Sequence, residues 1–475
     1  MLDKIKKLSK DTLVYGVSTM VSRFLNFILV PFYTNFIPPS EYGIIANIFA
    51  YIAILNVLFS IGMESGYFKF ASTLEVGSKK QNFSLPFFSV FINSLILSSI
   101  IFVFPGAFKP IFGVGEGYLV LVQYTALILF FDAIALVPFA YLRLNNKAKI
   151  FAAFKIINVV INVSMNLILI IGFNMGIEAI LISNVVASAA TVVLLLPIIL
   201  KNIEFSFNKE LLSELLRFSL PYIPAGISSN IIQVIDRPIL LYLTNDETAG
   251  IYTANYKLGI IMMLFVTVFD FAWRPFFLNH AKEPDAKKIF AKVMTLFVAV
   301  GSFVTLTTSV FLPEIVKIFG ASYRSGFEIV PLILLAYIFN GIYVNLMPGI
   351  YFEKKTKYLP IITGGAALLN VLVNVSLIPV MGMMGAAIAT LVSYVSMAVG
   401  LFFVAQKFYP IRYEYGKIVM LFISLFASFG IFLFLENIMG VNWYVGVIGV
   451  IIFSILVLAL RVFDPRMLIR LATGK

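Results

Sequence analysis

The chain has 475 residues, of which 61% are hydrophobic and 12% are charged, and its mean hydropathy is +1.00. Soluble globular chains are nearer half apolar and one quarter charged, so this composition excludes an ordinary soluble enzyme and indicates an integral membrane protein. The absence of cysteine and the single histidine exclude a disulfide framework and a multi-histidine zinc site. No G-x-x-x-x-G-K-[ST] motif is present, so we expect no ATP site. We also expect no cofactor, no metal and no catalytic residue.

Apolar segments follow one another along the whole chain, and each is close to the roughly 20 residues that a membrane-spanning helix needs. They are predicted at residues 12–36, 43–69, 83–104, 118–142, 150–172, 177–200, 217–243, 250–278, 289–312, 326–351, 358–379, 384–406, 417–437 and 442–462. The predicted fold class is therefore an all-α polytopic membrane protein with 14 transmembrane helices.

The basic residues lie in every second loop between these helices. One set of loops and the two ends hold 26 of the 35 Lys and Arg residues, and the other set holds only Lys109, Lys317 and Arg324. Cytoplasmic loops of membrane proteins carry this excess of Lys and Arg, so both termini are predicted to be cytoplasmic and the helix count to be even. The net charge of +12 then reflects topology and some attraction to anionic lipid, and we expect no nucleic-acid partner.

The sequence matches itself at an offset of about 207 residues. The matched positions are Pro31 with Pro238, Gly43 with Gly250, Phe104 with Phe311, Ile111-Phe112-Gly113 with Ile318-Phe319-Gly320 and, with one residue of slippage, Asn162 and Asn166 with Asn370 and Asn374. Six helices per repeat predict two parallel, pseudo-symmetric bundles. The predicted domains are a bundle at 1–200, an amphipathic linker at 201–216, a second bundle at 217–410 and two extra helices with a tail at 411–475.

Two six-helix bundles are the usual plan of an alternating-access transporter. A channel is more often built around one axis by several subunits, and a membrane enzyme would need a polar catalytic cluster in a loop, where none is visible. Within the linker, the apolar residues could lie in the membrane interface; they are Phe205, Phe207, Leu211, Leu212 and Leu215.

Charged and polar residues inside the bilayer are costly, by roughly 2.5–3.5 kcal/mol for a charge, and so mark candidate sites. They form strips on the predicted helices 1, 2, 7 and 8, and the first pair of helices corresponds to the second through the repeat. The predicted cavity residues that bind an anionic substrate are Arg23, Asn26, Lys69, Gln233, Arg237, Lys257 and Arg274. Predicted residues for gating or ion coupling are Glu64, Asp236 and Asp270.

Structural ion pairing is the alternative interpretation of these charges. Asp270 and Arg274 are spaced i,i+4 and could simply neutralise each other, whereas Asp236 and Arg237 are neighbours and are expected to need partners elsewhere. Asp132 is a weaker candidate, and Lys155 is expected to extend its ammonium group to the cytoplasmic surface.

Several stretches resemble the bacterial polysaccharide transporters, the Wzx-type lipid-linked oligosaccharide flippases of the MOP superfamily. The stretches are Arg23-Phe-Leu-Asn-Phe-Ile-Leu-Val-Pro31, Pro39-Ser-Glu-Tyr-Gly43, Gly62-Met-Glu-Ser-Gly-Tyr-Phe-Lys-Phe70, Asp236-Arg237 with Gly250-Ile-Tyr252, and the segment from Asn374 to Thr390. The resemblance covers nearly the whole chain and includes the count of fourteen helices.

The resemblance implies a cargo, a short oligosaccharide on undecaprenyl pyrophosphate, that is flipped across a bacterial cytoplasmic membrane. It also implies a cationic central cavity, coupling to an H⁺ or Na⁺ gradient, and polysaccharide polymerase and glycosyltransferase neighbours. A lipid II flippase and a MATE-type multidrug antiporter of the same fold are the alternatives. An anionic cargo is favoured because four bases stand against three acids; they are Arg23, Arg237, Lys257 and Arg274 against Glu64, Asp236 and Asp270. A membrane glycan polymerase or ligase is the alternative from another class, and the short extracytoplasmic loops argue against it.

Overall fold

The computed structural model describes residues 27–280, 283–353, 355–440 and 443–460, and over these residues the chain is helical and contains no strand. Eleven helices in this part of the chain are long and apolar enough to cross a membrane, and shorter apolar helices lie at Phe27–Phe36 and Trp443–Ala459. The predicted all-α polytopic fold is confirmed. The count of fourteen spans stays a prediction, since the first predicted helix begins outside the described residues.

The chain forms two compact units, Met1–Thr253 and Ala254–Lys475. The predicted domain limits at 200, 216 and 410 stay predictions. The main helices of the first unit are α2 (Pro39–Ser60), α3 (Met63–Thr73), α4 (Gln81–Val103), α5 (Pro105–Phe112), α6 (Leu119–Leu144), α7 (Ala148–Leu167), α8 (Glu178–Asn202), α9 (Lys209–Ser219), α10 (Tyr222–Val234), α11 (Asp236–Leu243) and most of α12 (Asp246–Tyr256).

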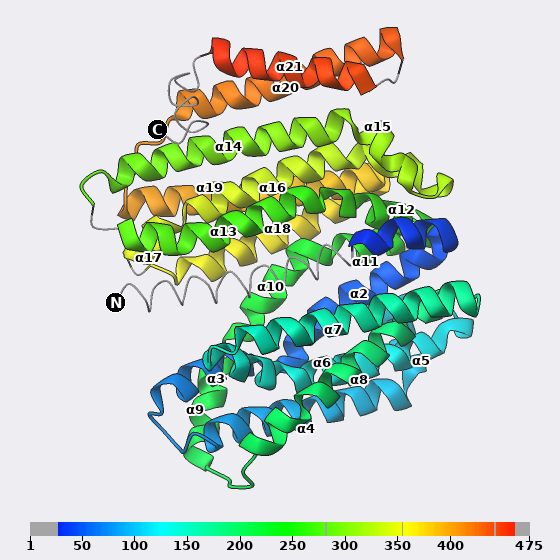
Figure 1. The fold of residues 1–475 in the computed structure, drawn as a ribbon, viewed down its shortest axis with the longest axis vertical. Coiled ribbons are helices and arrows are strands. Elements are labelled where there is room, and N and C mark those ends of the chain that lie inside the picture. The colour runs from blue at the N-terminus through cyan, green and yellow to red at the C-terminus, as the bar shows by residue number, and fades with distance from the viewer. Residues whose placement is uncertain (1–26, 281–282, 354, 441–442, 461–475) are drawn as a thin grey trace. The chain divides into compact units, whose positions relative to one another are not determined.

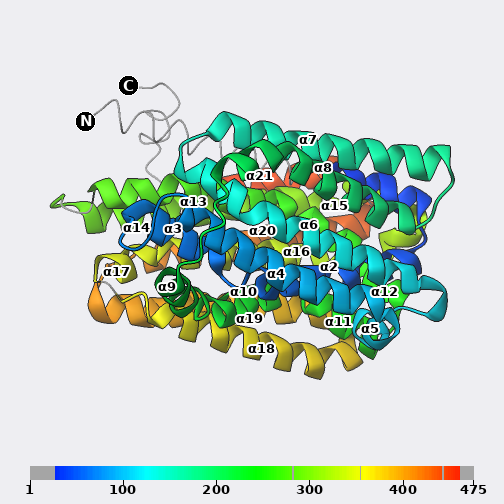
Figure 2. The ribbon, with the colours of Figure 1, turned by 90° about the horizontal axis from the view of Figure 1, so that it is seen from below.

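Helix α6 is the centre of the first unit (Figures 1 and 2), where it packs against α2, α3, α4, α7 and α8. Its most apolar stretch is 56% buried within the protein, whereas that of α7 is only 22% buried. Large apolar side chains on the outer face of α7, such as Ile156 and Val160, are exposed. In a membrane protein these exposed residues face lipid rather than water.

The second unit follows the same plan. Its main helices are α13 (Ile260–His280), α14 (Ala286–Val310), α15 (Leu312–Ile315), α16 (Val330–Asn345), α17 (Met347–Phe352), α18 (Tyr358–Met381), α19 (Met383–Phe408), α20 (Tyr415–Met439) and α21 (Trp443–Ala459). Helix α16 packs against α13, α14 and α19, and α20 and α21 pack on each other and on α14.

Two predicted helices are broken where the sequence carries Gly or Pro. The segment predicted at 43–69 divides at Ile61 and Gly62, which have φ angles of 43° and 66°. A Cβ on Gly62 would lie 2.4 Å from the carbonyl oxygen of Ser219, so glycine allows this close approach of the end of α9. The segment predicted at 217–243 is divided among α9, α10 and α11, with Pro221 at the first break.

The internal repeat is visible in the hydrogen bonds of the two units. In α7, the amide of Asn166 donates to the carbonyl oxygen of Asn162 at 2.8 Å and to its side-chain oxygen at 3.2 Å. In α18, Asn374 makes the same two bonds to Asn370, at 2.9 and 3.0 Å. These are the asparagine pairs that the sequence offset aligned, so the matched positions have matched roles.

The predicted interfacial stretch is only partly exposed. Leu211 and Leu215 of α9 are fully buried, on a helix that packs against α3 and α4, which corrects the expectation that they lie in the membrane interface. The side chain of Asn208 caps α9 by accepting a hydrogen bond from the Leu211 amide at 3.0 Å. Phe205 and Phe207 remain 91% and 72% exposed.

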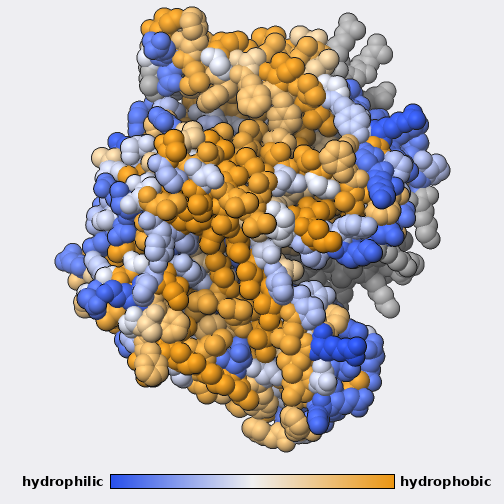
Figure 3. All heavy atoms as spheres, turned by 180° about the vertical axis from the view of Figure 1, so that it is seen from behind, coloured by the Kyte–Doolittle hydropathy of each residue, from blue (hydrophilic) through white to orange (hydrophobic). Residues whose placement is uncertain are grey.

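Figure 3 shows how polar and apolar residues divide over one face of the molecule. Apolar side chains cover the middle of this face, and hydrophilic side chains gather toward its two sides. Exposed apolar surface of this kind is what a bilayer requires of membrane-spanning helices.

Candidate functional site: a polar cavity in the first unit

A cavity of about 640 Å³ lies inside the first unit. Such a volume is within the range of roughly 300–1,000 Å³ that small-molecule sites occupy. Its lining comes from five helices and is listed here: Asn56, Val57, Ser60, Glu64, Asp132, Ala133, Ala135, Leu136, Phe139, Arg143, Phe151, Lys155, Asn158, Asn184, Ser188 and Thr191.

Helical spacing explains why these residues meet. Asp132, Leu136, Phe139 and Arg143 follow one another at intervals of four, three and four residues, which is one face of α6. The same four-and-three spacing places Phe151, Lys155 and Asn158 on one face of α7, and Asn184, Ser188 and Thr191 on one face of α8. The residues from α2 and α3 complete the wall.

The cavity runs from one end of α6 toward its middle. Arg143 lies in the last turn of α6, and its side chain is 42% exposed. The loop that follows this turn is predicted to be cytoplasmic. Asp132 lies eleven residues earlier, or about 16 Å along the axis at 1.5 Å per residue. Since the hydrocarbon core of a bilayer is about 30 Å thick, the cavity reaches from the predicted cytoplasmic end to about the bilayer centre.

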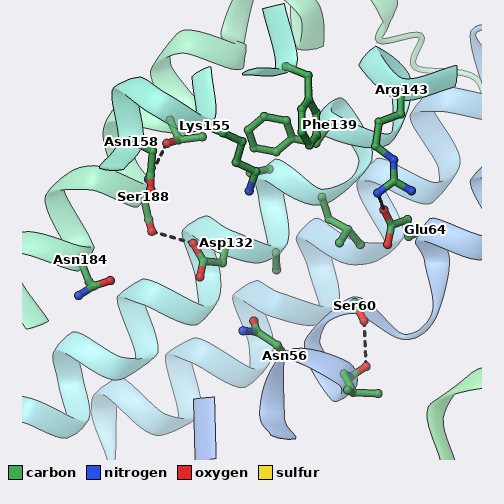
Figure 4. A pocket seen from close by; sticks show the side chains of 16 residues that line it. Asn56, Ser60, Glu64, Asp132, Phe139, Arg143, Lys155, Asn158, Asn184 and Ser188 are labelled. Atoms are coloured by element: carbon green, nitrogen blue, oxygen red, sulfur yellow. Dashed lines mark hydrogen bonds and ion pairs between the residues drawn. The ribbon is translucent and has the colours of Figure 1, made fainter. Parts of the chain in front are cut away.

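Hydrogen bonds and one ion pair connect the walls of the cavity (Figure 4). Arg143 pairs with Glu64 of α3 at 3.1 Å, and Ser188 of α8 donates to a carboxylate oxygen of Asp132 at 2.7 Å. Asn158 of α7 donates to the hydroxyl oxygen of Thr191 at 2.9 Å. Each of these contacts joins two different helices, so the cavity has a defined shape.

Lys155 lines the cavity. This differs from the prediction that its ammonium group extends to the cytoplasmic surface. Its ammonium nitrogen lies 4.4 Å from the centre of the Phe139 ring, a cation–π contact. No carboxylate lies within ion-pair distance of it in the part of the chain that the structure describes, although Asp132 and Glu64 both act on it electrostatically. Lys155 therefore places a basic group in the same cavity as the acidic side chain of Asp132.

The sequence-predicted site residues lie in several places. Arg23 and Asn26 are outside the described residues. Glu64 lines the cavity. Lys69 is exposed beside the rings of Phe70 and Phe218, at 5.1 Å from each, and does not line it.

The remaining predicted residues lie on either side of the α10–α11 break or in the second unit. Gln233 is exposed. Arg274 pairs with Asp270 at 2.8 Å within α13, as the structural alternative expected, and Lys257 lies in the turn before α13. Their roles in substrate binding and ion coupling stay predictions.

The prediction that Asp236 and Arg237 need separate partners is wrong. Their side chains form an ion pair at 2.7 Å, and Asp236 also accepts the backbone amide of Arg237 at 3.0 Å. Tyr252 donates its hydroxyl to the other carboxylate oxygen. The rule that helical neighbours do not face each other fails here because Asp236 is the first residue of α11, where the backbone amide of Arg237 has no helical carbonyl partner and can donate to the carboxylate.

Asn158, Asn184, Ser188 and Thr191 were not singled out from the sequence. Their signal was present, since amides and hydroxyls recur with helical spacing on otherwise apolar segments. They carry no charge, so the rarity of charged residues in apolar segments does not mark them. No group of three or more His, Asp or Glu side chains that could hold a metal ion occurs within the described residues.

Residues 8–281 match the family model described as "Polysaccharide biosynthesis protein". No curated protein matches the chain in sequence.

Solved structures of the same fold are transporters and flippases. An inward closed structure of the lipid II flippase MurJ is 16% identical, with a TM-score of 0.73, over 96% of this chain and 100% of that one. An inward-facing multidrug resistance MATE family transporter of the MOP superfamily is 13% identical, with a TM-score of 0.67, over 83% of this chain and 97% of that one. The Vibrio cholerae MATE transporter VcmN in its bent form is 14% identical, with a TM-score of 0.59, over 85% and 96% of the two chains. At these identities the likeness shows the fold, and it confirms the expected fold of the MOP superfamily.

Proposed function

The chain belongs to the family of polysaccharide biosynthesis proteins, and from this premise we propose that it flips undecaprenyl-pyrophosphate-linked oligosaccharide units across the bacterial cytoplasmic membrane. The cargo would enter from the cytoplasmic leaflet and leave toward the outer one by alternating access. The product would serve the assembly of a surface polysaccharide, an O-antigen, a capsule or an exopolysaccharide. Polymerase and glycosyltransferase partners belong to the same proposal.

The observation that carries the proposal is the polar cavity of the first unit. Its walls are membrane-spanning helices, yet it holds four charged side chains, listed as Glu64, Asp132, Arg143 and Lys155. Ionisable groups inside a bilayer are expensive, and they usually mark the path of a substrate or an ion. A cavity of this size and polarity gives a hydrophilic cargo a place at bilayer depth.

The anionic head of the cargo is proposed to bind the cationic residues predicted from the sequence. The sequence predicts Arg23 and Arg237 on repeat-related helices, and a guanidinium group keeps its charge and can hold phosphate oxygens bidentately. Lys69, Lys257 and Arg274 are the further cations of this set. Glu64, Asp236 and Asp270 are proposed for gating or for H⁺ or Na⁺ coupling.

The test uses the purified protein in liposomes with three separate cargoes. The first is undecaprenyl pyrophosphate that carries a short oligosaccharide, the second is lipid II, and the third is the cationic dye ethidium. For the two lipids, the fraction of the sugar that an externally added lectin can reach reports flipping with time. For ethidium, uptake into the vesicles reports transport.

Faster equilibration of the oligosaccharide lipid than in protein-free vesicles, without comparable movement of the other two cargoes, is expected. Movement of lipid II alone would replace the proposal with lipid II flipping, and movement of ethidium alone would replace it with drug antiport. In the same vesicles, an imposed pH or Na⁺ gradient should change the initial rate. Asp270→Asn or Glu64→Gln should remove that response if either carboxylate couples transport to the ion.

A further inference from the structure

The charges that line the cavity of the first unit are balanced. Two acids, Glu64 and Asp132, face two bases, Arg143 and Lys155. A ligand with a net charge would leave an uncompensated charge among membrane-spanning helices, where the dielectric constant is lower than in bulk water, and this is unfavourable. An uncharged polar ligand has no such penalty, so the cavity fits a neutral hydrophilic molecule better than a pyrophosphate.

Amides and hydroxyls make up the rest of the polar lining. They are Asn56, Ser60, Asn158, Asn184, Ser188 and Thr191. Each of these groups can both donate and accept a hydrogen bond. A sugar hydroxyl also does both, so a surface that mixes amides and hydroxyls around balanced charges matches the chemistry of an oligosaccharide.

Two of the amides have hydrogen-bonding capacity left for a ligand. Asn56 makes no side-chain hydrogen bond within the described residues, and its amide faces the cavity (Figure 4). Asn184 donates one N–H to the carbonyl oxygen of Ile180 at 2.8 Å, while its side-chain oxygen accepts none from the described part of the chain. A polar group without a partner at bilayer depth costs free energy, and a bound ligand or water relieves that cost.

We propose that this cavity holds the sugar part of the cargo, an uncharged oligosaccharide, and that the amides of Asn56 and Asn184 bond its hydroxyl groups. The inference rests on the proposed function and refines it, because it separates the sugar subsite from the cations that hold the pyrophosphate. The two residues would then decide which glycan is accepted, while the lipid and the pyrophosphate would be recognised elsewhere.

The variants are Asn56→Ala and Asn184→Ala, with Asn202→Ala as the matched control. Asn202 lies on the same helix as Asn184 and makes the same bond, donating to the carbonyl oxygen four residues earlier at 2.7 Å, but it does not line the cavity. Flipping is measured with undecaprenyl pyrophosphate that carries a neutral oligosaccharide and with sugar-free undecaprenyl pyrophosphate. Binding of the free neutral oligosaccharide is measured on the detergent-purified protein by its effect on the melting temperature.

Each cavity variant should raise the apparent KM for the glycosylated lipid about three- to tenfold, the loss expected for one or two neutral hydrogen bonds. The sugar-free lipid should be unaffected, and so should Asn202→Ala. The variants should also weaken stabilisation by the free oligosaccharide by a similar factor. Asn184→Ser, which keeps a hydroxyl, should recover part of the loss.

An equal effect on both lipids would overturn the proposal, because the cavity would then bind the pyrophosphate. No effect on either lipid, with no stabilisation of the wild-type protein by the free sugar, would also overturn it. Failure of the proposed function looks different. In that case the wild-type protein flips neither lipid, while the binding measurement still shows whether Asn56 and Asn184 contact a sugar.

Discussion

Gly43 and Gly250 are packed so closely that a Cβ on either one would collide with the other's helix. A Cβ on Gly43 would lie 1.9 Å from the carbonyl oxygen of Asp246, and one on Gly250 would lie 1.9 Å from that of Pro39. The contact is reciprocal, because Pro39 and Gly43 fall on Asp246 and Gly250 at the repeat offset of 207 residues. Both helix starts lie at the predicted extracytoplasmic end, so equivalent parts of the two repeats meet there.

We predict that Gly43→Ala and Gly250→Ala each destabilise the protein by about 1–3 kcal/mol, because the atoms that must move are backbone atoms. Gly365→Ala is the control, since a Cβ at Gly365 meets no other atom within 4 Å. The melting temperature of the detergent-purified variants measures the difference. Equal melting temperatures for Gly43→Ala and Gly365→Ala would contradict this contact.

The ion pair between Asp236 and Arg237 gives a second prediction. The pair is buried, with Asp236 2% and Arg237 9% exposed. Asp236→Asn should therefore lower stability by about 3–5 kcal/mol, because it removes the buried carboxylate that pairs with the guanidinium group of Arg237. Tyr252→Phe removes the hydroxyl group that donates to the same carboxylate and should lower stability by about 1 kcal/mol.

Protein abundance in the membrane and the melting temperature measure these effects. A normally abundant and stable Asp236→Asn variant with altered transport would instead favour the predicted gating role. A drop in abundance that Arg237→Ala shares would identify the two residues as a structural pair.

The charge bias of the loops predicts the topology. Reporter fusions at Lys79 and Lys355 should give a cytoplasmic signal, and a fusion at Glu116 should give an extracytoplasmic one, because basic loops stay in the cytoplasm. These sites can be compared within one set of fusions of similar abundance. A cytoplasmic signal at Glu116 would reverse the predicted orientation of the cavity mouth at Arg143.

The fold could be predicted from the sequence because its causes are local. The length of the apolar segments and the alternation of basic loops are both properties of short stretches, and neither depends on tertiary contacts. The breaks near Gly62 and Pro221 were harder to place. Gly62 adopts a positive φ where the end of α9 approaches, and that approach is a tertiary contact that the sequence of α2 and α3 does not contain.

The cavity could be predicted only in part, since it depends on which helix faces meet. Glu64 can be found because a charge is rare in an apolar segment, but its partner Arg143 lies just beyond the helix predicted at 118–142. Lys155 was expected at the surface because its own helix places it near one end, and only the packing of α6 against α7 shows Phe139 beside it. The convergence of five helices on one volume is a tertiary property.

Low pH should weaken the hydrogen bonds that Glu414 accepts in the second unit. Glu414, just before α20, is partly buried, which alone raises its pKa, but hydrogen bonds from Lys417 and Thr295, both at 2.7 Å, hold the pKa below its ordinary value of 4.5. A carboxyl with a lowered pKa stabilises the folded state above its unfolded pKa, and that stabilisation is lost as the pH falls through the folded value.

The melting temperature of the wild-type protein should therefore fall more steeply below about pH 4.5 than that of Glu414→Gln, which cannot titrate. Above that pH the variant should be the less stable of the two. Parallel curves for the two proteins across this range would show that Glu414 does not link α14 to α20 as described.

The balance of charge in the cavity gives the last prediction. Asp132→Asn leaves the lining with one excess positive charge, and Lys155→Met leaves it with one excess negative charge. For a neutral glycan both single variants should slow flipping, because an unbalanced charge at bilayer depth orders water that the sugar must displace. For a glycan that contains one acidic sugar, Asp132→Asn should flip the cargo faster than Lys155→Met does by about tenfold or more, since the excess positive charge of the first variant attracts the cargo and the excess negative charge of the second repels it.

The double variant restores neutrality and should bring the two rates for neutral and acidic glycans closer together than either single variant does. The double-mutant cycle isolates the interaction between the two residues, provided that all four proteins are equally abundant in the vesicles. Additive effects in that cycle, with no dependence on the charge of the glycan, would show that Asp132 and Lys155 act independently and that the cavity does not sense the charge of the sugar.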